Sequence, residues 1–104
     1  MNLGWDLPEK NRRHVIRIKT AYFGKLRECT QAGKEILKVA ADCRLGGLLD
    51  HLATKYGPDF KHLLAPRNSY VILINGHNSL FCDGEKAVLH EGDQVVFMPV
   101  TTGG

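Results

Sequence analysis

The chain has 104 residues, of which 43% are hydrophobic and 24% are charged, and its formal net charge is +3. This composition fits one globular domain with too little chain for a second core, and the small, dispersed positive charge lacks the dense basic stripe of nucleic-acid-binding proteins. No apolar run approaches the roughly 20 residues that cross a bilayer and no secretory signal is apparent, so we expect a cytoplasmic protein without nucleic-acid or membrane partners.

The first elements in chain order are a leader and two strands. Residues 1–13 show no periodicity and are predicted to form a flexible leader. Residues 14–23 alternate between apolar and polar side chains over much of their length, which predicts a half-buried strand. Residues 23–30 break this alternation and predict a short helical turn or a loop. Residues 34–40 alternate again, so the two strands are expected to form a hairpin.

A helix is predicted next, over residues 45–56, because leucines recur there at helical spacing. Asp42 is a plausible N-cap, and Gly57-Pro58 is a typical helix end. Gly46-Gly47 weakens the helix by about 1 kcal/mol per residue relative to alanine. A close approach between helix and sheet would explain these glycines. Residues 59–64 predict a further short helical turn.

Two continuous apolar runs, Tyr70–Ile74 and Val95–Met98, predict strands that are buried on both faces. The first run is the strongest strand signal in the chain and is expected to be central. Asn75-Gly76 follows it as a strong turn signal. Residues 77–89 are irregular, with a further turn at Asp83-Gly84.

This order of elements predicts an α+β domain in which a four- to five-stranded mixed sheet packs on one main helix. The domain is expected to span residues 14–98, between the leader of residues 1–13 and an extended tail of residues 99–104. In such a fold the last strand can lie centrally beside the first and so fix where the tail leaves the sheet. The pattern alone does not establish that pairing.

The tail has the properties of a segment whose terminal carboxylate is modified by another protein. Pro99 ends the last strand, and the β-branched residues Val100, Thr101 and Thr102 favour an extended chain. Gly103-Gly104 is thin enough to enter a narrow channel in another protein. The terminal carboxylate needs activation before it reacts, and because the sequence has no phosphate-binding loop, a second protein would have to activate it. The alternative interpretation is an ordinary frayed terminus.

The cysteines and histidines give weaker signals. The three cysteines, Cys29, Cys43 and Cys82, are widely separated, so we expect reduced structural thiols, with a redox or sulfur-relay role for one of them as the alternative. The five histidines show no metal-ligand spacing, and no metal site is predicted.

Four segments in this order together resemble the ubiquitin-like sulfur carriers, and most of all the small subunits of molybdopterin synthases. They are Phe23-Gly24-Lys25-Leu26-Arg27-Glu28, Ile74-Asn75-Gly76, Glu91-Gly92-Asp93-Gln94-Val95 and Met98-Pro99-Val100-Thr101-Thr102-Gly103-Gly104. The resemblance covers nearly all of residues 14–104 and implies a β-grasp fold. It differs from the common family pattern at Pro99-Val100, where a second proline is usual.

The resemblance implies a protein substrate that is not catalytic alone and binds no cofactor. An E1-like enzyme would use ATP to adenylate Gly104, which follows Gly103, and a persulfide sulfur donor would convert it to a thiocarboxylate. The tail would then enter the large subunit of molybdopterin synthase, where the sulfur builds the dithiolene of molybdopterin, the ligand of molybdenum or tungsten.

By position, the resemblance also implies partner-binding residues. Phe23 and Met98 match apolar contacts, Arg27 matches a basic residue near the same surface, and the tail residues Pro99, Val100, Thr101 and Thr102 enter the partner. The alternative for Phe23 and Met98 is packing in the core. For Arg27 it is simple exposure to solvent.

Three other functions stay open from the sequence. The chain could donate sulfur to thiamine synthesis or to tRNA thiolation. It could be a covalent protein modifier whose activated carboxyl group is captured by a lysine. It could also be a binding module without tail chemistry.

Overall fold

The structure is a computed structural model that describes residues 15–64 and 70–100. The predicted leader of residues 1–13 and the tail residues Thr101 to Gly104 lie outside the described residues. Within the described ranges, no helix is long and apolar enough to cross a membrane.

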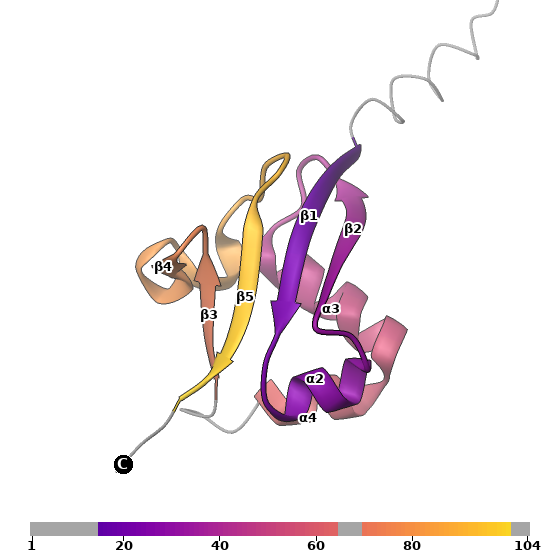
Figure 1. The fold of residues 1–104 in the computed structure, drawn as a ribbon. Helices are drawn as coiled ribbons and strands as arrows, with labels where there is room; N and C mark the ends of the chain where they lie inside the picture. The colour runs from indigo at the N-terminus through magenta and orange to yellow at the C-terminus, as the bar shows by residue number, and fades with distance from the viewer. Residues whose placement is uncertain (1–14, 65–69, 101–104) are drawn as a thin grey trace, which may run out of the picture.

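Five strands, three α-helices and two 3-10 helices make up the described part of the chain (Figure 1). In chain order they are β1 (Val15–Tyr22), α2 (Lys25–Thr30), β2 (Lys34–Ala40), α3 (Leu45–Tyr56), α4 (Pro58–Leu64), β3 (Tyr70–Ile74), β4 (His77–Asn78), η1 (Ser79–Phe81), η2 (Gly84–Lys86) and β5 (Gln94–Pro99). The strand and helix patterns of the sequence therefore fall where they were predicted. The segment after residue 23 is a short helix, α2.

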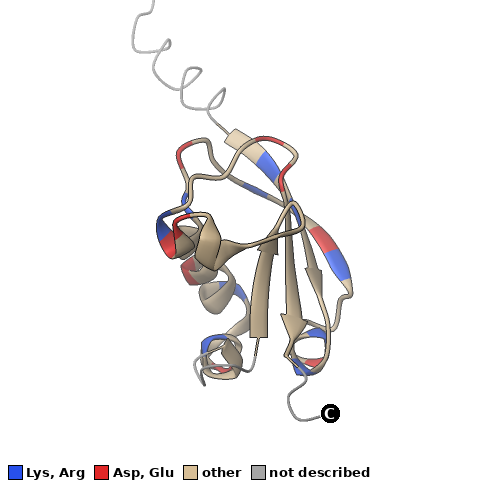
Figure 2. Cartoon of the chain, turned by 90° about the vertical axis from the view of Figure 1, so that its left-hand side faces the viewer, with Lys and Arg blue, Asp and Glu red and all other residues tan. Residues whose placement is uncertain are grey.

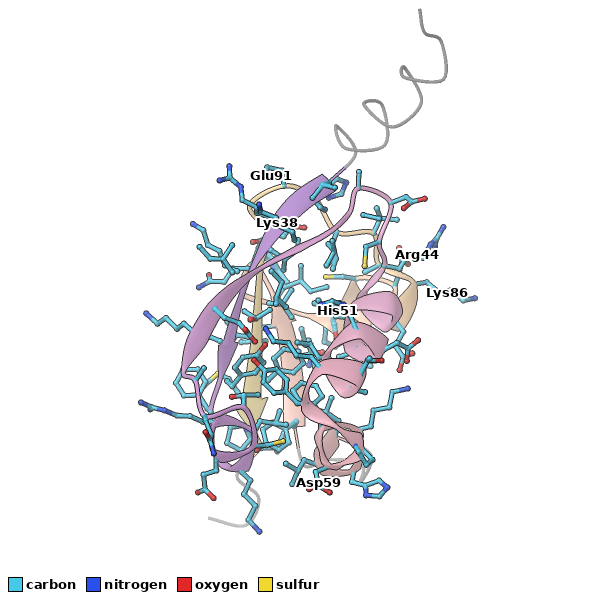
Figure 3. The ribbon with its side chains drawn as sticks, turned by 90° about the vertical axis from the view of Figure 1, so that its right-hand side faces the viewer. Lys38, Arg44, His51, Asp59, Lys86 and Glu91 are labelled. Atoms are coloured by element: carbon cyan, nitrogen blue, oxygen red, sulfur yellow. The ribbon has the colours of Figure 1, made fainter. Side chains whose placement is uncertain are left out.

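The strands form one mixed sheet in the order β2-β1-β5-β3-β4. Strands β1 and β5 run parallel, and the other neighbouring pairs are antiparallel. The helix α3 covers one face of this sheet, so the domain has two layers (Figure 3). This arrangement confirms the predicted α+β architecture and the β-grasp fold.

The last strand is the central one, which corrects the expectation for Tyr70–Ile74. β5 lies between β1 and β3, whereas β3 has only the two-residue strand β4 on its other side. The expectation that β5 is buried on both faces is also wrong. Val95 and Phe97 are fully buried, but Met98 is 40% exposed, because helices cover only one face of the sheet. The apolar run therefore supplies both a core face and an open face.

The start of α3 differs from the prediction as well. Its N-cap is Arg44 and not Asp42, and no side chain caps it. The backbone N–H of Leu45 instead donates to the carbonyl oxygen of Ala87 at 2.9 Å, so a tertiary contact replaces the side-chain cap. A Cβ atom on Gly46 would lie 3.2 Å from Oε1 of Glu85. The close approach that this glycine permits is thus to η2, not to the sheet.

Four aromatic rings anchor β5 in the core. The ring of Phe97 stacks on Tyr22, with centroids 5.4 Å apart, and meets Phe60 edge-on at 5.7 Å. Tyr56 stacks on Phe60 at 6.1 Å. Aromatic pairs in these geometries add to the free energy gained from burial alone. The central strand is therefore held to both β1 and the helical layer.

The tyrosines of this cluster share a carboxylate, that of Glu35 on β2. It accepts hydrogen bonds from Tyr22 and Tyr56, both at 2.6 Å, and from Lys55 Nζ at 2.8 Å. Burial alone would raise the pKa of Glu35, but the hydrogen bonds from Lys55, Tyr22 and Tyr56 together lower it below its ordinary value. Burial and the bond to Glu35 raise the pKa of Tyr22, so its hydroxyl remains a donor.

This cluster predicts a loss of stability in acid. Because folding lowers the pKa of Glu35, its ionised form stabilises the fold above its ordinary pKa of 4.5, and this stabilisation is lost as the pH falls through the folded value. We expect Glu35→Gln to lower the free energy of unfolding at pH 7 by about 1–2 kcal/mol and to flatten its decline in acid. Urea unfolding across the acid range measures both effects. Asp50→Asn, in an exposed ion pair with Lys61, is the control and should leave the curve nearly unchanged. Identical curves for Glu35→Gln and the unaltered chain would refute the role of Glu35.

Candidate functional site

The candidate site lies at the end of the sheet where β1 and β5 finish side by side (Figure 1). The parallel register pairs Tyr22 with Phe97, so the following residues, Phe23 and Met98, are also neighbours. The backbone N–H of Phe23 donates to the carbonyl oxygen of Phe97 at 3.2 Å. Since side chains alternate along a strand and Tyr22 and Phe97 face the core, Phe23 and Met98 face outward.

Phe23 is 41% exposed and Met98 is 40% exposed. The alternative that these two side chains pack in the core is therefore excluded. Three partly exposed residues continue the same face, because Leu73 pairs with Val96 and Val71 pairs with Met98. We call this set the apolar surface: Phe23, Val71, Leu73, Val96 and Met98. The strands β3 and β5 carry no charged residues, in contrast to β1 and β2, and the tan strands of Figure 2 show this.

Tyr70 ties the start of β3 to the end of β1, next to Pro99. Its hydroxyl group donates to the carbonyl oxygen of Phe23 at 3.1 Å and accepts from the backbone N–H of Leu26 at 3.1 Å. A Cβ atom on Gly24 would lie 3.0 Å from this hydroxyl oxygen and 3.2 Å from Cγ of Pro99. These contacts fix the direction in which the chain leaves β5. The sequence did not identify Tyr70 as a site residue. Its position beside Pro99 follows only from the pairing of β3 with β5.

The backbone conformation at position 24 is predicted to require a glycine. Its φ is +66° and its ψ is −141°, a combination that residues with a Cβ rarely adopt. We expect Gly24→Ala to lower the free energy of unfolding by about 1–3 kcal/mol, through backbone strain and the contact with Tyr70 and Pro99. Urea unfolding measures the change.

The same substitution at Gly47 is the matched control. A Cβ atom there would meet only Sγ of Cys43, at an ordinary 3.4 Å, within the helix α3. Gly47→Ala should therefore raise the free energy of unfolding by up to about 1 kcal/mol. Equal effects at the two glycines would contradict the assigned role of Gly24.

Arg27 lies at the same end of the sheet, on α2. Its side chain is exposed, and its Nε lies 3.5 Å from where a Cβ on Gly33 would be, just before β2. Val100, at the end of the described chain, is half-buried. The structure thus brings Phe23, Met98 and Pro99 into one site and places Arg27 beside it. The predicted site residues Thr101, Thr102, Gly103 and Gly104 lie outside the described residues.

Two of the three thiols, those of Cys29 and Cys43, are in surroundings that disfavour the reactive thiolate. Cys29, Cys43 and Cys82 are free and half-buried. Burial raises the pKa of Cys29, with a further contribution from Asp59, and burial together with Asp42 raises that of Cys43. These two thiols are therefore mostly protonated at neutral pH, as expected of structural cysteines. Among the described residues, no three metal-ligating side chains come together.

Known proteins are similar to this chain in sequence and in architecture. The ThiS family profile matches residues 20–104. The molybdopterin synthase sulfur carrier subunit of Drosophila sechellia is 28% identical over 92 residues, which cover 86% of this chain and 93% of that protein. The subunit of the same name from Mycobacterium tuberculosis is 29% identical, over 86% of this chain and 100% of its own. The solution structure of small archaeal modifier protein 1 from Methanosarcina acetivorans superposes with a TM-score of 0.71 at 25% identity, over 88% of this chain and 99% of its own.

Proposed function

Because the chain belongs to the ThiS family, we propose that it is the sulfur-carrying small subunit of a molybdopterin synthase. Gly104 carries the sulfur, and Gly103 provides the narrow approach to it. The observation that carries this proposal is the place where β5 ends: the central strand, which the tail follows in the sequence, finishes at the end of the sheet beside an exposed apolar surface. The names of the curated relatives support the choice of pathway.

The chemistry begins with the terminal carboxylate. A partner adenylating enzyme joins it to the AMP portion of ATP and releases pyrophosphate. The terminal sulfur of a persulfide donor attacks the acyl carbon and displaces AMP, and a second thiol then cleaves the S–S bond to leave a thiocarboxylate on Gly104. The thiocarboxylate sulfur is a far better nucleophile than a carboxylate oxygen and attacks carbon on the pterin precursor. Hydrolysis restores the carboxylate. The carrier supplies the nucleophile, and its partners supply the catalysis.

The proposal assigns a role in this cycle to each predicted residue. Phe23 and Met98 are the most exposed residues of the apolar surface, which fits apolar contacts with the large subunit and with the adenylating enzyme in turn. Arg27 provides a cation at the edge of that contact. Pro99 and Val100 direct the chain out of the sheet, and the segment Thr101-Thr102 spans the partner's channel.

A second candidate function is covalent protein tagging. The similarity to small archaeal modifier protein 1 favours it, at 25% identity over most of both chains. The same acyl-adenylate would then be captured by a lysine amine instead of a sulfur. Sulfur donation to thiamine or to tRNA stays a further alternative, because it uses the same activation of Gly104.

A deletion strain of the source organism separates these functions. We expect loss of molybdopterin and of molybdoenzyme activity, with both restored by the unaltered gene. Thiamine, thiolated tRNA and the pattern of protein conjugates should stay normal. Normal molybdopterin together with lost tRNA thiolation, lost thiamine or lost conjugates would overturn the proposed pathway in favour of the matching alternative.

A further inference from the structure

The outer face of β1 and β2 carries a row of cations around one exposed isoleucine. The antiparallel register pairs Arg17 with Lys38 and Lys19 with Ile36, and Ala21 pairs with Lys34. All of these side chains point away from the helices, because Ile18 and Leu37 face the core. We call Arg17, Lys19, Lys34, Ile36 and Lys38 the basic face.

Two adjacent hollows lie along this face. One has a volume of about 450 Å³ and lies among Lys19, Lys34, Ile36 and their neighbours. The other has a volume of about 300 Å³ and is lined by Arg17, Lys19, Ile36, Glu91 and Gly92. Because Lys19 and Ile36 line both, the two hollows are adjacent along the strands, and we call them together the groove. Ile36 is 64% exposed in its centre.

The charges of the basic face are only partly balanced. Arg17 Nε donates to Glu91 Oε2 at 3.1 Å, and the backbone N–H of Arg17 donates to Oε1 at 2.9 Å. Figure 3 shows Glu91 and Lys38 at the same end of the sheet. Within the described part of the chain, Lys19, Lys34 and Lys38 form no ion pair. Like charges placed opposite each other, such as Arg17 and Lys38, destabilise a strand pair. An acidic ligand would remove that cost.

We propose that the basic face binds an acidic, extended segment of the protein that loads or unloads the tail. An apolar centre with a charged rim is the usual anatomy of a protein interface, and Ile36 with the three lysines has that form. The groove is also continuous with the apolar surface, since Ala21 pairs with both Lys34 and Val96. A partner seated on the apolar surface therefore extends over the basic face.

A protein segment fits this face better than a nucleic acid. Nucleic-acid grooves combine cations with aromatic side chains on which bases stack, and the basic face has none. Its one guanidinium, on Arg17, is already held by Glu91. The remaining cations are lysines, which act as point charges and suit single carboxylates. The identity of the partner as a loading or unloading protein rests on the proposed function, whereas the acidic ligand rests on the groove alone.

A nuclear magnetic resonance titration of the full chain tests the groove. The probe is a decapeptide of alternating glutamate and valine, and controls are the same peptide with lysine in place of glutamate and a single-stranded RNA decamer. We expect the acidic peptide to shift the amide signals of Lys19, Lys34, Ile36 and Lys38, with affinity that weakens as salt rises. No shifts there, or tighter binding of the RNA decamer, would overturn the proposal.

The variant Lys38→Glu tests whether binding of the acidic peptide can be weakened without a loss of stability. It places a carboxylate opposite Arg17, so the stability of the fold should be kept or raised. Affinity for the acidic peptide should fall roughly ten-fold. Lys86→Glu is the matched control, because Lys86 is exposed on η2, on the opposite side of the molecule from Lys38 in Figure 3. Equal losses in the two variants would overturn the site. This titration needs no sulfur chemistry, so its result is independent of whether Gly104 carries sulfur.

Discussion

A single alanine added after Gly104 is expected to abolish sulfur loading of this protein. The carbonyl group that the adenylating enzyme activates would then belong to a residue with a Cβ atom and would lie one residue farther along the tail. A reactive group must be placed within about an ångström of its productive position, and a misplaced one loses at least two orders of magnitude in rate. Intact-mass spectrometry after incubation with the adenylating enzyme, ATP and a persulfide donor measures the loading.

The same alanine added before Met1 is the control for this extension. It changes the mass and composition of the chain equally but leaves Gly104 terminal, so loading should proceed as in the unaltered protein. Equal loading of the two extended chains would contradict the claim that loading requires a glycine at the C-terminus.

Phe97→Ala is expected to cause the largest loss of stability of any substitution at the exit of the tail. Phe97 is fully buried, and it stacks on Tyr22 and meets Phe60 edge-on. Truncation removes these contacts and leaves a cavity beneath the central strand, at a cost of about 3–5 kcal/mol. Urea unfolding at neutral pH measures this cost.

The neighbouring residue in the same strand provides the comparison. Met98 is 40% exposed, so Met98→Ala should change the free energy of unfolding by less than about 1 kcal/mol. The same variant should weaken the complex with the large subunit, since Met98 lies on the apolar surface. If Phe97→Ala and Met98→Ala were equally stable, the account of β5 as an anchored central strand would be wrong.

Local patterns in the sequence predicted most of the elements. Alternation in β1 and β2, leucine spacing in α3 and the Asn75-Gly76 turn depend on residues close together in the chain. The structure gives positive φ values of 52° at Asn75 and 87° at Gly76, as that turn requires. Such signals are complete within a few residues, so they need no knowledge of the tertiary fold.

Features that depend on distant parts of the chain could not be predicted in this way. The pairing of β1 with β5 joins residues more than seventy positions apart, such as Lys19 and Gln94, and no local pattern encodes it. No local pattern encodes the pairing of Tyr70 with Pro99 either. Nor does one encode the hydrogen bond from Leu45 to Ala87, which takes the place of the helix cap predicted at Asp42. The open outer face of β5 was missed because an apolar run does not show whether one or two layers cover a strand.

The site was accessible from the sequence mainly through resemblance. Phe23, Arg27 and Met98 have no distinctive local pattern, and only their match to a family marked them. The structure adds that Phe23 and Met98 are exposed side by side, and that the basic face lies next to them. That face was missed because Lys38 comes to lie opposite Arg17, and Ile36 opposite Lys19, only once the hairpin has formed.

The most direct test of the central claim is to locate sulfur on the unaltered chain. The protein is incubated with its adenylating enzyme, ATP and a persulfide donor, and the C-terminal peptide is then fragmented in a mass spectrometer. The account predicts that one oxygen is replaced by one sulfur and that the change lies on Gly104. Sulfur found on Cys29, Cys43 or Cys82 with an unchanged Gly104 would contradict it.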